Sequence, residues 1–336
     1  MKKNVLRVLS MALIFALLLL AVGCTSSSQP AENPGEVVEE DPADTYPRKP
    51  ITLAVGFNPG GDTDLLARAM ADGISKELGT SVVVSNQPGA GGSIAAAYVK
   101  DSDPDGYTLC FCHNPIPANY VCGLTDYSIE AFEVACIVAK NDAIYLTLNP
   151  DKYPTLDDYL TYVKEHPGET TFGAVFGGSY QPMTMGVIDE LGLDVNLVDI
   201  GGAANGNIEV AAGRVDAVFC SYAGCKDYLE NGDLYPALVL SAERRPEYPD
   251  VPTLVEMGGS AAASMQYGFY FPKGTPESII NKFDDAAKKV CESQEFKDLC
   301  AKYAAEPDFH PYGEAFEVMK AIEDFYMPYK EILAGN

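Results

Sequence analysis

The sequence has no tryptophan and only three histidines among its 336 residues. So few histidines leave little room for a His-rich metal site. Basic residues are also scarce: 23 Lys and Arg stand against 48 Asp and Glu, which gives a formal net charge of -25. This balance argues against nucleic-acid binding, because such proteins need basic side chains to displace counterions. It argues equally against docking on anionic lipid through charge.

Long apolar runs are equally rare, and the single one lies at the extreme N-terminus, which excludes a polytopic membrane protein. The run covers 11–22 and follows three basic residues, so it is too short for a span of roughly 20 residues. We therefore predict a secretory signal peptide over 1–23. The small residues just before Cys24 resemble the lipobox of bacterial lipoproteins, which predicts that Cys24 is lipidated. The alternative is an ordinary signal peptide with a chance cysteine.

Residues 24–46 begin with a Ser-rich stretch and continue with Pro, Gly and six acidic residues as far as Asp44. A segment of this composition buries too little apolar surface to fold. We predict a flexible acidic tether that lets the folded body stand off the membrane.

The remaining cysteines do not form a metal-binding motif. No C-x-x-C pair occurs among Cys110, Cys112, Cys122, Cys136, Cys220, Cys225, Cys291 and Cys300. Their spacing argues against zinc, so we predict no metal site. An exported protein can form disulfides, yet many of these cysteines lie in apolar runs typical of small buried residues. The sequence leaves the pairing open.

From Lys49 onward, short apolar runs alternate with amphipathic segments. We predict strands over 51–57, 81–85 and 107–112, with helices over 63–78 and 92–100 between them. This order of strands and helices predicts an α/β protein with a mostly parallel sheet covered by helices. The alternation continues to a final helix over about 312–333.

Two glycine-containing turns lie between a predicted strand and a predicted helix, at 57–64 and 173–180. A turn that leads into a helix exposes unpaired backbone N–H groups and the positive end of the helix dipole. Glycine lets an anion approach those groups closely. Two such turns facing each other would hold a small carboxylate without Arg or Lys. The alternative is that both are ordinary tight turns of an α/β protein.

Several motifs, taken in order, are more specific than either turn. They are Pro59-Gly60-Gly61-x-Thr63-Asp64, Asn86-x-Pro88-Gly89-Ala90-Gly91-Gly92, Pro104-Asp105-Gly106-Tyr107-Thr108-Leu109, Gly213-Arg214-Val215-Asp216, Pro249-Asp250-Val251-Pro252-Thr253 and Pro272-x-Gly274-Thr275-Pro276. From about Tyr46 to the C-terminus, the chain resembles the extracytoplasmic solute receptors of the tripartite tricarboxylate transporter type. The resemblance is most specific in its N-terminal third.

The resemblance implies a periplasmic-binding-protein type II fold, the Venus flytrap, with two doubly wound α/β domains joined by a hinge. We place the first domain at 47–147 plus 243–336 and the second at 148–242. The resemblance also implies a monomeric receptor outside the cytoplasm, anchored to the cell membrane by the lipidated cysteine. It would deliver a small carboxylate to membrane permease subunits, without catalysis or a cofactor.

Two other functions remain as alternatives. A ligand sensor for a membrane signalling protein such as a sensor kinase would have the same fold and pocket. An enzyme is disfavoured, because Ser179 lacks the second glycine of a nucleophile elbow and no histidine lies beside an acid in a suggestive context.

The resemblance points to ligand-binding residues in both turns and beside them. Together with residues at neighbouring cleft positions, the candidates are Phe57, Asn58, Gly60, Gly61, Asp62, Thr63, His113, Asn114, Gly177, Gly178, Ser179, Tyr180, Asp199 and Tyr222. Asp64 is expected to orient the first turn and to pair with Arg68 four residues later rather than to contact ligand.

The chain departs from the family pattern at several of these positions. Asp62 stands where a small or hydroxylated residue is common, Pro182 where a His is typical, and Asp199 begins a strand end from which the usual Lys is missing. Two added carboxylates disfavour a doubly or triply charged anion, which suggests an amine-bearing acid as ligand. The alternative is that both Asp side chains cap helix N-termini or face solvent.

Overall fold

The computed structural model describes residues 41–201, 203–260 and 262–334. The predicted signal peptide, Cys24 and most of the predicted tether lie outside the described residues. The chain from Asp41 onward forms one compact unit. None of the helices in this described part combines the length and the apolar character that a membrane crossing requires.

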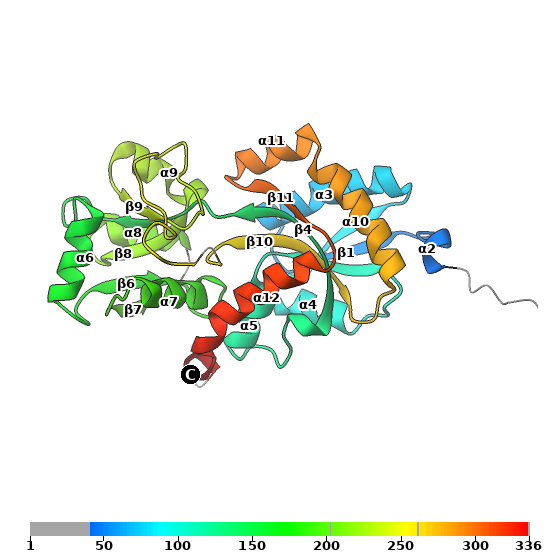
Figure 1. The fold of residues 1–336 in the computed structure, drawn as a ribbon, viewed down its shortest axis with the longest axis horizontal. Helices are drawn as coiled ribbons and strands as arrows, with labels where there is room; N and C mark the ends of the chain where they lie inside the picture. Colours follow the sequence, from blue (N-terminus) through cyan, green and yellow to red (C-terminus); the bar gives the residue numbers. More distant parts are fainter. Residues whose placement is uncertain (1–40, 202, 261, 335–336) are drawn as a thin grey trace, which may run out of the picture. The chain divides into compact units, whose positions relative to one another are not determined.

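A six-stranded sheet forms the centre of what we call the first lobe (Figure 1), with strand order β11-β4-β10-β3-β1-β2. Its strands are β1 (Ile51–Val55), β2 (Val82–Asn86), β3 (Thr108–Cys112), β4 (Phe132–Asn141), β10 (Met265–Pro272) and β11 (Glu306–His310). The α-helices between and after these strands are α3 (Asp62–Leu78), α4 (Ser93–Lys100), α5 (Pro115–Val121), α10 (Glu277–Cys291), α11 (Gln294–Lys302), α12 (Glu314–Tyr326) and α13 (Lys330–Ala334). Shorter elements are α2 (Pro42–Thr45) and the 3-10 turns η1 (Ala90–Gly92), η2 (Ile129–Ala131) and η3 (Met327–Tyr329).

A five-stranded sheet forms the centre of the second lobe, with strand order β7-β6-β8-β5-β9. Its strands are β5 (Ile144–Leu148), β6 (Thr171–Ala174), β7 (Asn196–Asp199), β8 (Ala217–Ser221) and β9 (Tyr235–Val239). The helices of this lobe are α6 (Leu156–Glu165), α7 (Tyr180–Glu190), α8 (Ala203–Ala211) and α9 (Tyr222–Asn231).

Both sheets are mixed, so the prediction of a mostly parallel sheet is wrong. β1 pairs in parallel with β2 and β3, and β6 pairs in parallel with β7 and β8. The chain leaves the first lobe along β4 and returns along β10, and these two strands pair antiparallel with each other. In the second lobe β5 is antiparallel to both of its neighbours. The strands that connect the lobes therefore make the antiparallel part of each sheet.

Helix α3 shows how the sequence positions the first turn. Its buried residues Leu66, Met70 and Ile74 recur every four positions and face the core. Burial of each contributes roughly 1.5–3 kcal/mol. The helix ends at Gly79, which has a φ of 65° and so adopts the left-handed conformation expected from its position.

The C-terminal segment is broken where a single helix was predicted. Helix α12 ends at Tyr326, a 3-10 turn follows over Met327–Tyr329, and α13 begins at Lys330. Pro328 lies in this turn and has no N–H group to continue the α-helical hydrogen bonds. The sequence reading overlooked this proline.

The change from the first sheet to the second lies between Asn141 and Ile144, because β5 already belongs to the second lobe. The segment after β9 stays with that lobe, since Val251 shares a buried cluster with Ala143, Tyr145 and Val239. The return therefore lies near Ser264, where β10 begins. The exact domain boundaries given above stay a prediction.

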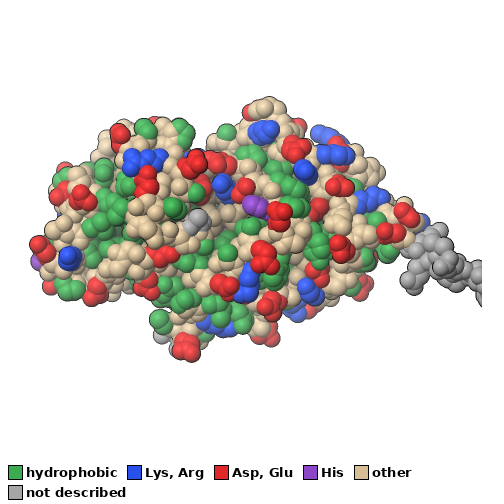
Figure 2. Space-filling view, viewed as in Figure 1, with side chains coloured by type: hydrophobic (Ala, Val, Ile, Leu, Met, Phe, Trp, Pro, Cys, Tyr) green, Lys and Arg blue, Asp and Glu red, His purple; other side chains and the backbone are tan. Residues whose placement is uncertain are grey.

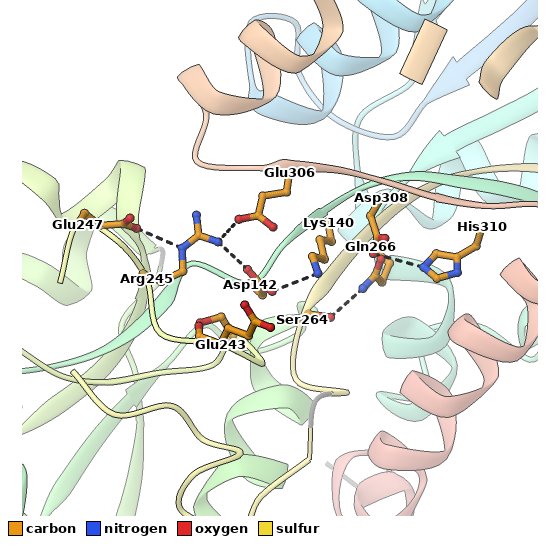
Figure 3. Close-up of polar contacts among 11 residues, drawn as sticks. Lys140, Asp142, Glu243, Arg245, Glu247, Ser264, Gln266, Glu306, Asp308 and His310 are labelled. Atoms are coloured by element: carbon orange, nitrogen blue, oxygen red, sulfur yellow. Dashed lines mark hydrogen bonds and ion pairs between the residues drawn. The ribbon is translucent and has the colours of Figure 1, made fainter. Parts of the chain in front are cut away.

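Arg245 bridges the two lobes beside these connections (Figure 3). Its Nη1 donates to Asp142 Oδ1 over 3.3 Å and to Glu306 of β11, and its Nε donates to Glu247 Oε1 over 3.3 Å. Lys140 lies 3.7 Å from the second oxygen of Asp142. Because Arg245 belongs to the second-lobe segment and Glu306 to the first sheet, this guanidinium joins the lobes at the hinge.

The surface carries the large negative charge in dispersed form. On the face drawn in Figure 2, Asp and Glu side chains are spread over both ends of the molecule rather than gathered into one patch. The eight cysteines from Cys110 to Cys300 are free thiols, and all except Cys122 are buried.

Candidate functional site

The first turn follows β1 and is held by the buried carboxylate of Asp64, which is 1% exposed. Asp64 Oδ2 accepts from the Gly60 amide over 2.9 Å and from Arg68 Nε over 3.0 Å. Asn86 Nδ2 donates to Asp64 Oδ1 over 2.7 Å and to the Phe57 carbonyl over 3.1 Å. The predicted role of Asp64 in orienting the turn and pairing with Arg68 is confirmed.

The charge of Asp64 is stabilised despite its burial. Burial raises the pKa of this carboxyl, but hydrogen bonds from Arg68, Asn86 and the Gly60 amide outweigh burial and hold the pKa below its ordinary value. The turn is therefore organised around a permanent anion at neutral pH.

Several amides of the first turn remain available for a ligand. Those of Gly60 and Thr63 are already bonded, to the carboxylates of Asp64 and Asp62 respectively. Within the part of the chain that the structure describes, nothing accepts a hydrogen bond from the amides of Gly61 and Asp62. These two groups lie at the N-terminus of α3, where no side chain caps the helix. They are suited to an anion.

Asp62 is the first residue of α3 and is exposed. Its Oδ1 accepts from the Thr63 amide over 2.7 Å, and its Oδ2 accepts from the Tyr267 hydroxyl over 2.8 Å. No Lys or Arg in the described residues forms an ion pair with Asp62. The site therefore contains a carboxylate that no protein cation neutralises.

His113 is held between aromatic rings beside Asp62. It stacks on Phe57 with ring centroids 4.9 Å apart and meets Tyr267 edge-on at 5.8 Å. Burial lowers the pKa of His113, and the charge of Asp62 only partly opposes this. The Asn114 amide donates to His113 Nδ1 over 2.7 Å, which assigns the proton of the neutral ring to Nε2. His113 thus offers a fixed hydrogen-bond donor.

Asn114 is fully buried, and its side chain is occupied within the protein. Its Nδ2 donates to the Ser264 carbonyl over 2.7 Å and to the Tyr326 hydroxyl over 3.3 Å, while its Oδ1 accepts from the Gln266 amide over 3.0 Å. These bonds join the end of β3 to the start of β10. Asn114 therefore acts at the hinge, and we assign it no ligand contact.

The second turn follows β6 and leads into α7. The Gly177 amide donates to Gln181 Oε1 over 2.8 Å, which closes the turn from inside the helix. Among the described residues we find no acceptor for the amides of Gly178, Ser179 and Tyr180. Ser179 is 8% exposed and does not cap α7 with its side chain. This helix end therefore also presents open amides.

Asp199 supports the second turn. Its Oδ1 accepts from the Gly201 amide over 2.9 Å and, at 3.4 Å, from the Phe176 amide. Asp62 and Asp199 are both exposed, and each accepts a hydrogen bond from a nearby backbone amide. The alternative given above, that both Asp side chains cap helix N-termini or face solvent, therefore stands beside a ligand contact for either residue.

The two turns approach each other across the lobes. A Cβ added at Gly91, in the loop beside the first turn, would lie 3.4 Å from the Gly177 carbonyl oxygen. Burial raises the pKa of Tyr180, with smaller contributions from Cys220 and Asp62. The structure therefore places Gly177 of the second turn against the loop that packs beside the first turn.

The other predicted residues divide between these groups. Asn58 is exposed in the first turn, whereas the Thr63 side chain is buried and donates only to Asp62, over 3.3 Å. Tyr222 follows β8 and packs in a cluster with Tyr145 and Tyr248 at centroid distances of 6.1 and 6.2 Å. Tyr222 therefore packs toward the hinge segment.

Two supporting residues were missing from the predicted site. Asn86 ends β2, and Gln181 stands four residues after the glycine that it caps. The spacing of Gln181 from Gly177 is visible in the sequence, whereas the position of Asn86 depends on strand pairing. Tyr267, which the sequence places in the predicted cleft half as a residue that could cover a ligand, donates to Asp62.

Similar proteins define the class to which this fold and site belong. A solved solute-binding protein of the TctC type from Polaromonas, without ligand, is 28% identical and superimposes with a TM-score of 0.75. The match covers 86% of this chain and 100% of that one. A second structure, an R. palustris protein solved with adipate, is 26% identical with a TM-score of 0.66, over 86% of this chain and 98% of that one. The fold is that of two-lobed periplasmic solute-binding proteins.

The family follows from sequence as well as structure. The family described as "Tripartite tricarboxylate transporter family receptor" matches residues 66–334. A relative from Cupriavidus necator, a UPF0065 protein, is 31% identical over 284 residues, which are 79% of this chain and 81% of the relative. The chain belongs to the tripartite tricarboxylate transporter receptor family and is one of its solute-binding receptors, which confirms the resemblance found in the motifs.

Proposed function

We propose that this protein is a lipid-anchored receptor outside the cytoplasm that binds a small carboxylate between the first and second turns. In this proposal it delivers the ligand to the membrane subunits of a tripartite tricarboxylate-type transporter and performs no chemistry on it. Membership of the receptor family supports the role, and the signal-peptide and lipobox pattern ending at Cys24 supports the location.

The proposal rests on two uncapped helix N-termini, one after each turn, with the second turn lying against the loop at Gly91 beside the first turn. The amides of Gly61 and Asp62 belong to one, and those of Gly178 and Ser179 to the other. Hydrogen bonds from such amides to a charged group contribute about 1.5–3 kcal/mol each, and the dipoles of α3 and α7 favour the same negative charge. The similar R. palustris protein solved with adipate supports a carboxylate as the class of ligand.

The remaining ligand contacts in the proposal surround these amides. They are Phe57, Asn58 and Gly60 beside α3, His113 beside β3, and Gly177 and Tyr180 beside α7. His113 donates through Nε2, and the rings of Phe57 and Tyr180 cover the apolar part of the ligand.

We further propose that the ligand carries an amine besides its carboxylate. Asp62 faces the site without a cationic partner among the described side chains, so a second ligand carboxylate would meet an unopposed negative charge. An ammonium group in the same place would instead form a charge-assisted hydrogen bond. Arg68, the nearest basic side chain in this network, is already bound to Asp64 and Asn86.

A panel of six-carbon acids tests this proposal on the purified full-length protein. Adipate has two carboxylates, 6-aminohexanoate has one carboxylate and an amine at the other end, and hexanoate has one carboxylate and no second charged group. We expect 6-aminohexanoate, or an α-amino acid added to the panel, to raise the thermal unfolding midpoint more than adipate or citrate. A ligand at 100-fold its Kd stabilises by about 2.7 kcal/mol.

The outcomes separate the parts of the proposal. Stabilisation by adipate, citrate or terephthalate but by no amine-bearing acid would remove the amine and keep the carboxylate. No response to any carboxylate would overturn the binding function. Release of the Cys24→Ala variant from the membrane fraction is expected for a lipid anchor, and its retention would argue against one.

A further inference from the structure

Helix α12 of the first lobe packs on α7 of the second lobe (Figure 1). The last turn of α12 contains Phe325 and Tyr326, and Tyr329 follows in the 3-10 turn. Helix α7 is the same helix whose N-terminus carries the open amides of the second turn. The contact therefore joins a remote part of the first lobe to one half of the candidate site.

Gly186 makes the close approach of the two helices possible. It is a buried residue inside α7, and a Cβ added there would lie 2.7 and 2.9 Å from Phe325 Cε1 and Cε2. Real Cβ atoms do not come this close to a neighbour, so any larger residue would push α12 and α7 apart or displace the ring. The Phe325 ring is half-buried and occupies the space that a side chain would need.

A hydrogen bond fastens the same contact one turn further along α7. The Tyr329 hydroxyl donates to Asp189 Oδ2 over 2.6 Å. Burial, together with this bond to Asp189, raises the pKa of Tyr329, so the hydroxyl keeps its proton at every physiological pH. Tyr329 is 7% exposed, and water therefore competes little for its proton.

The same end of α12 also reaches the first-lobe side of the site. The buried hydroxyl of Tyr326 accepts from Asn114, the neighbour of His113. The end of α12 and the 3-10 turn after it thus contact Gly186 of α7, Asp189 of α7 and Asn114 beside His113. One short segment of the first lobe therefore contacts the supports of both halves of the site.

We propose that Gly186, Phe325 and Tyr329 are positioning residues that hold the N-terminus of α7 where its amides face the first turn. The proposal rests on the carboxylate-binding function proposed above. None of the three residues touches the ligand. They act by holding the two lobes in the arrangement in which the amides of α3 and α7 share one anion.

Gly186 to alanine separates positioning from ordinary stability. Glycine is a poor helix former, and alanine inside α7 favours the helix by itself. If Gly186 had a merely structural role, its substitution would change ligand affinity and unliganded stability in the same direction. For a positioning residue we expect the unliganded thermal midpoint of G186A to stay close to that of the wild type while ligand affinity falls.

The test uses the full-length protein and measures the affinity for 6-aminohexanoate and for adipate by calorimetry and local opening by hydrogen exchange. We expect G186A to raise Kd by roughly tenfold and to speed amide exchange around 325–329. F325A in the G186A background removes the ring that the new methyl group meets, so the double variant should recover part of the affinity. Tyr329→Phe should weaken binding several-fold, whereas Tyr98→Phe, on the exposed face of α4, should not.

The inference is overturned if G186A binds the ligand with the affinity of the wild type. It is also overturned if G186A loses both thermal stability and affinity and the added F325A substitution restores neither the thermal midpoint nor the affinity. Failure of the wild type to bind any carboxylate would instead count against the proposed function. The exchange measurement needs no ligand, so unchanged exchange at 325–329 in G186A would still refute the docking role.

Discussion

Replacing Arg245 by methionine tests whether this side chain holds the hinge. The guanidinium is 13% exposed and contacts Asp142 and Glu247, whose side chains are 9% and 20% exposed, as well as the more open Glu306. Methionine keeps much of the aliphatic stem but leaves two largely buried carboxylates without their common cation. Breaking a buried pair on one side costs about 3–5 kcal/mol. Lys140 still lies 3.7 Å from Asp142, so we expect the lower end, about 3 kcal/mol of unfolding free energy.

Glu306→Gln is the matched control, because it removes one partner of the same guanidinium. The Glu306 side chain is 45% exposed, so water replaces much of what it loses. Loss of an exposed ion pair costs about 0–1 kcal/mol. Urea unfolding at pH 7 measures both variants, with ligand affinity as a second readout of hinge geometry.

The pH dependence of the unfolding free energy tests the same prediction independently. Burial raises the pKa of Asp142 above its ordinary value, while Lys140 and Arg245 partly oppose this. A carboxyl with a raised folded-state pKa destabilises the fold at pH values above that pKa, and the cost disappears as pH falls toward the unfolded value of about 3.9. Without Arg245 the pKa rises further, so the penalty of Arg245→Met should be smaller at pH 5 than at pH 7. Equal destabilisation by Arg245→Met and Glu306→Gln would refute the reasoning.

Three further predictions concern the candidate site. Asp64→Ala leaves the Gly60 amide and Asn86 without their acceptor and should lower the unfolding free energy by about 2–3 kcal/mol. The control Asp72→Ala, on the exposed part of the same helix, should change it by less than about 0.5 kcal/mol. Similar losses for the two variants in urea unfolding would contradict the role of Asp64. Because the folded-state pKa of Asp64 is depressed, its contribution is complete at neutral pH and is lost only as pH falls below about 4, which acid unfolding of wild type against Asp64→Ala measures. Asp62→Asn should weaken an amine-bearing ligand by roughly tenfold in calorimetry and strengthen adipate, and an unchanged ratio of the two affinities would show that Asp62 does not face the ligand. Burial lowers the pKa of His113 below its ordinary value of about 6.5, so binding of the amine-bearing ligand should stay flat from about pH 8 down to about 6.5 and weaken only at lower pH, where an imidazolium would compete for Asp62. Stronger binding in acid would contradict this assignment.

The fold was largely predictable because its signals are local. Apolar spacing along Leu66, Met70 and Ile74 indicates α3, and Gly79 indicates its end. The mixed pairing of the sheets was not predictable, since β10 pairs with β4 across more than a hundred residues and no local pattern records the direction of a partner strand. The break at Pro328 was visible in the sequence and was overlooked.

The candidate site, like the fold, was predictable from the sequence only where its contacts are local. The two turns and the Asp64–Arg68 pair follow from spacing within a few residues. By contrast, the side chain of Asn114 bonds to Ser264 and Tyr326, and Asp62 meets Tyr267, all from distant parts of the chain. Sequence spacing cannot separate a polar side chain that faces a ligand from one that holds the hinge. Asn114 was therefore grouped with the ligand contacts, although its side chain serves the protein itself.

A crystal structure of the full-length protein with the acid that binds it best tests the central claim most directly. We expect one carboxylate with oxygens about 3 Å from amides of both helix ends, those of Gly61 or Asp62 and those of Gly178 or Ser179. A ligand bound elsewhere, or one whose carboxylate contacts an arginine or lysine while these amides bond only to water, would contradict the account.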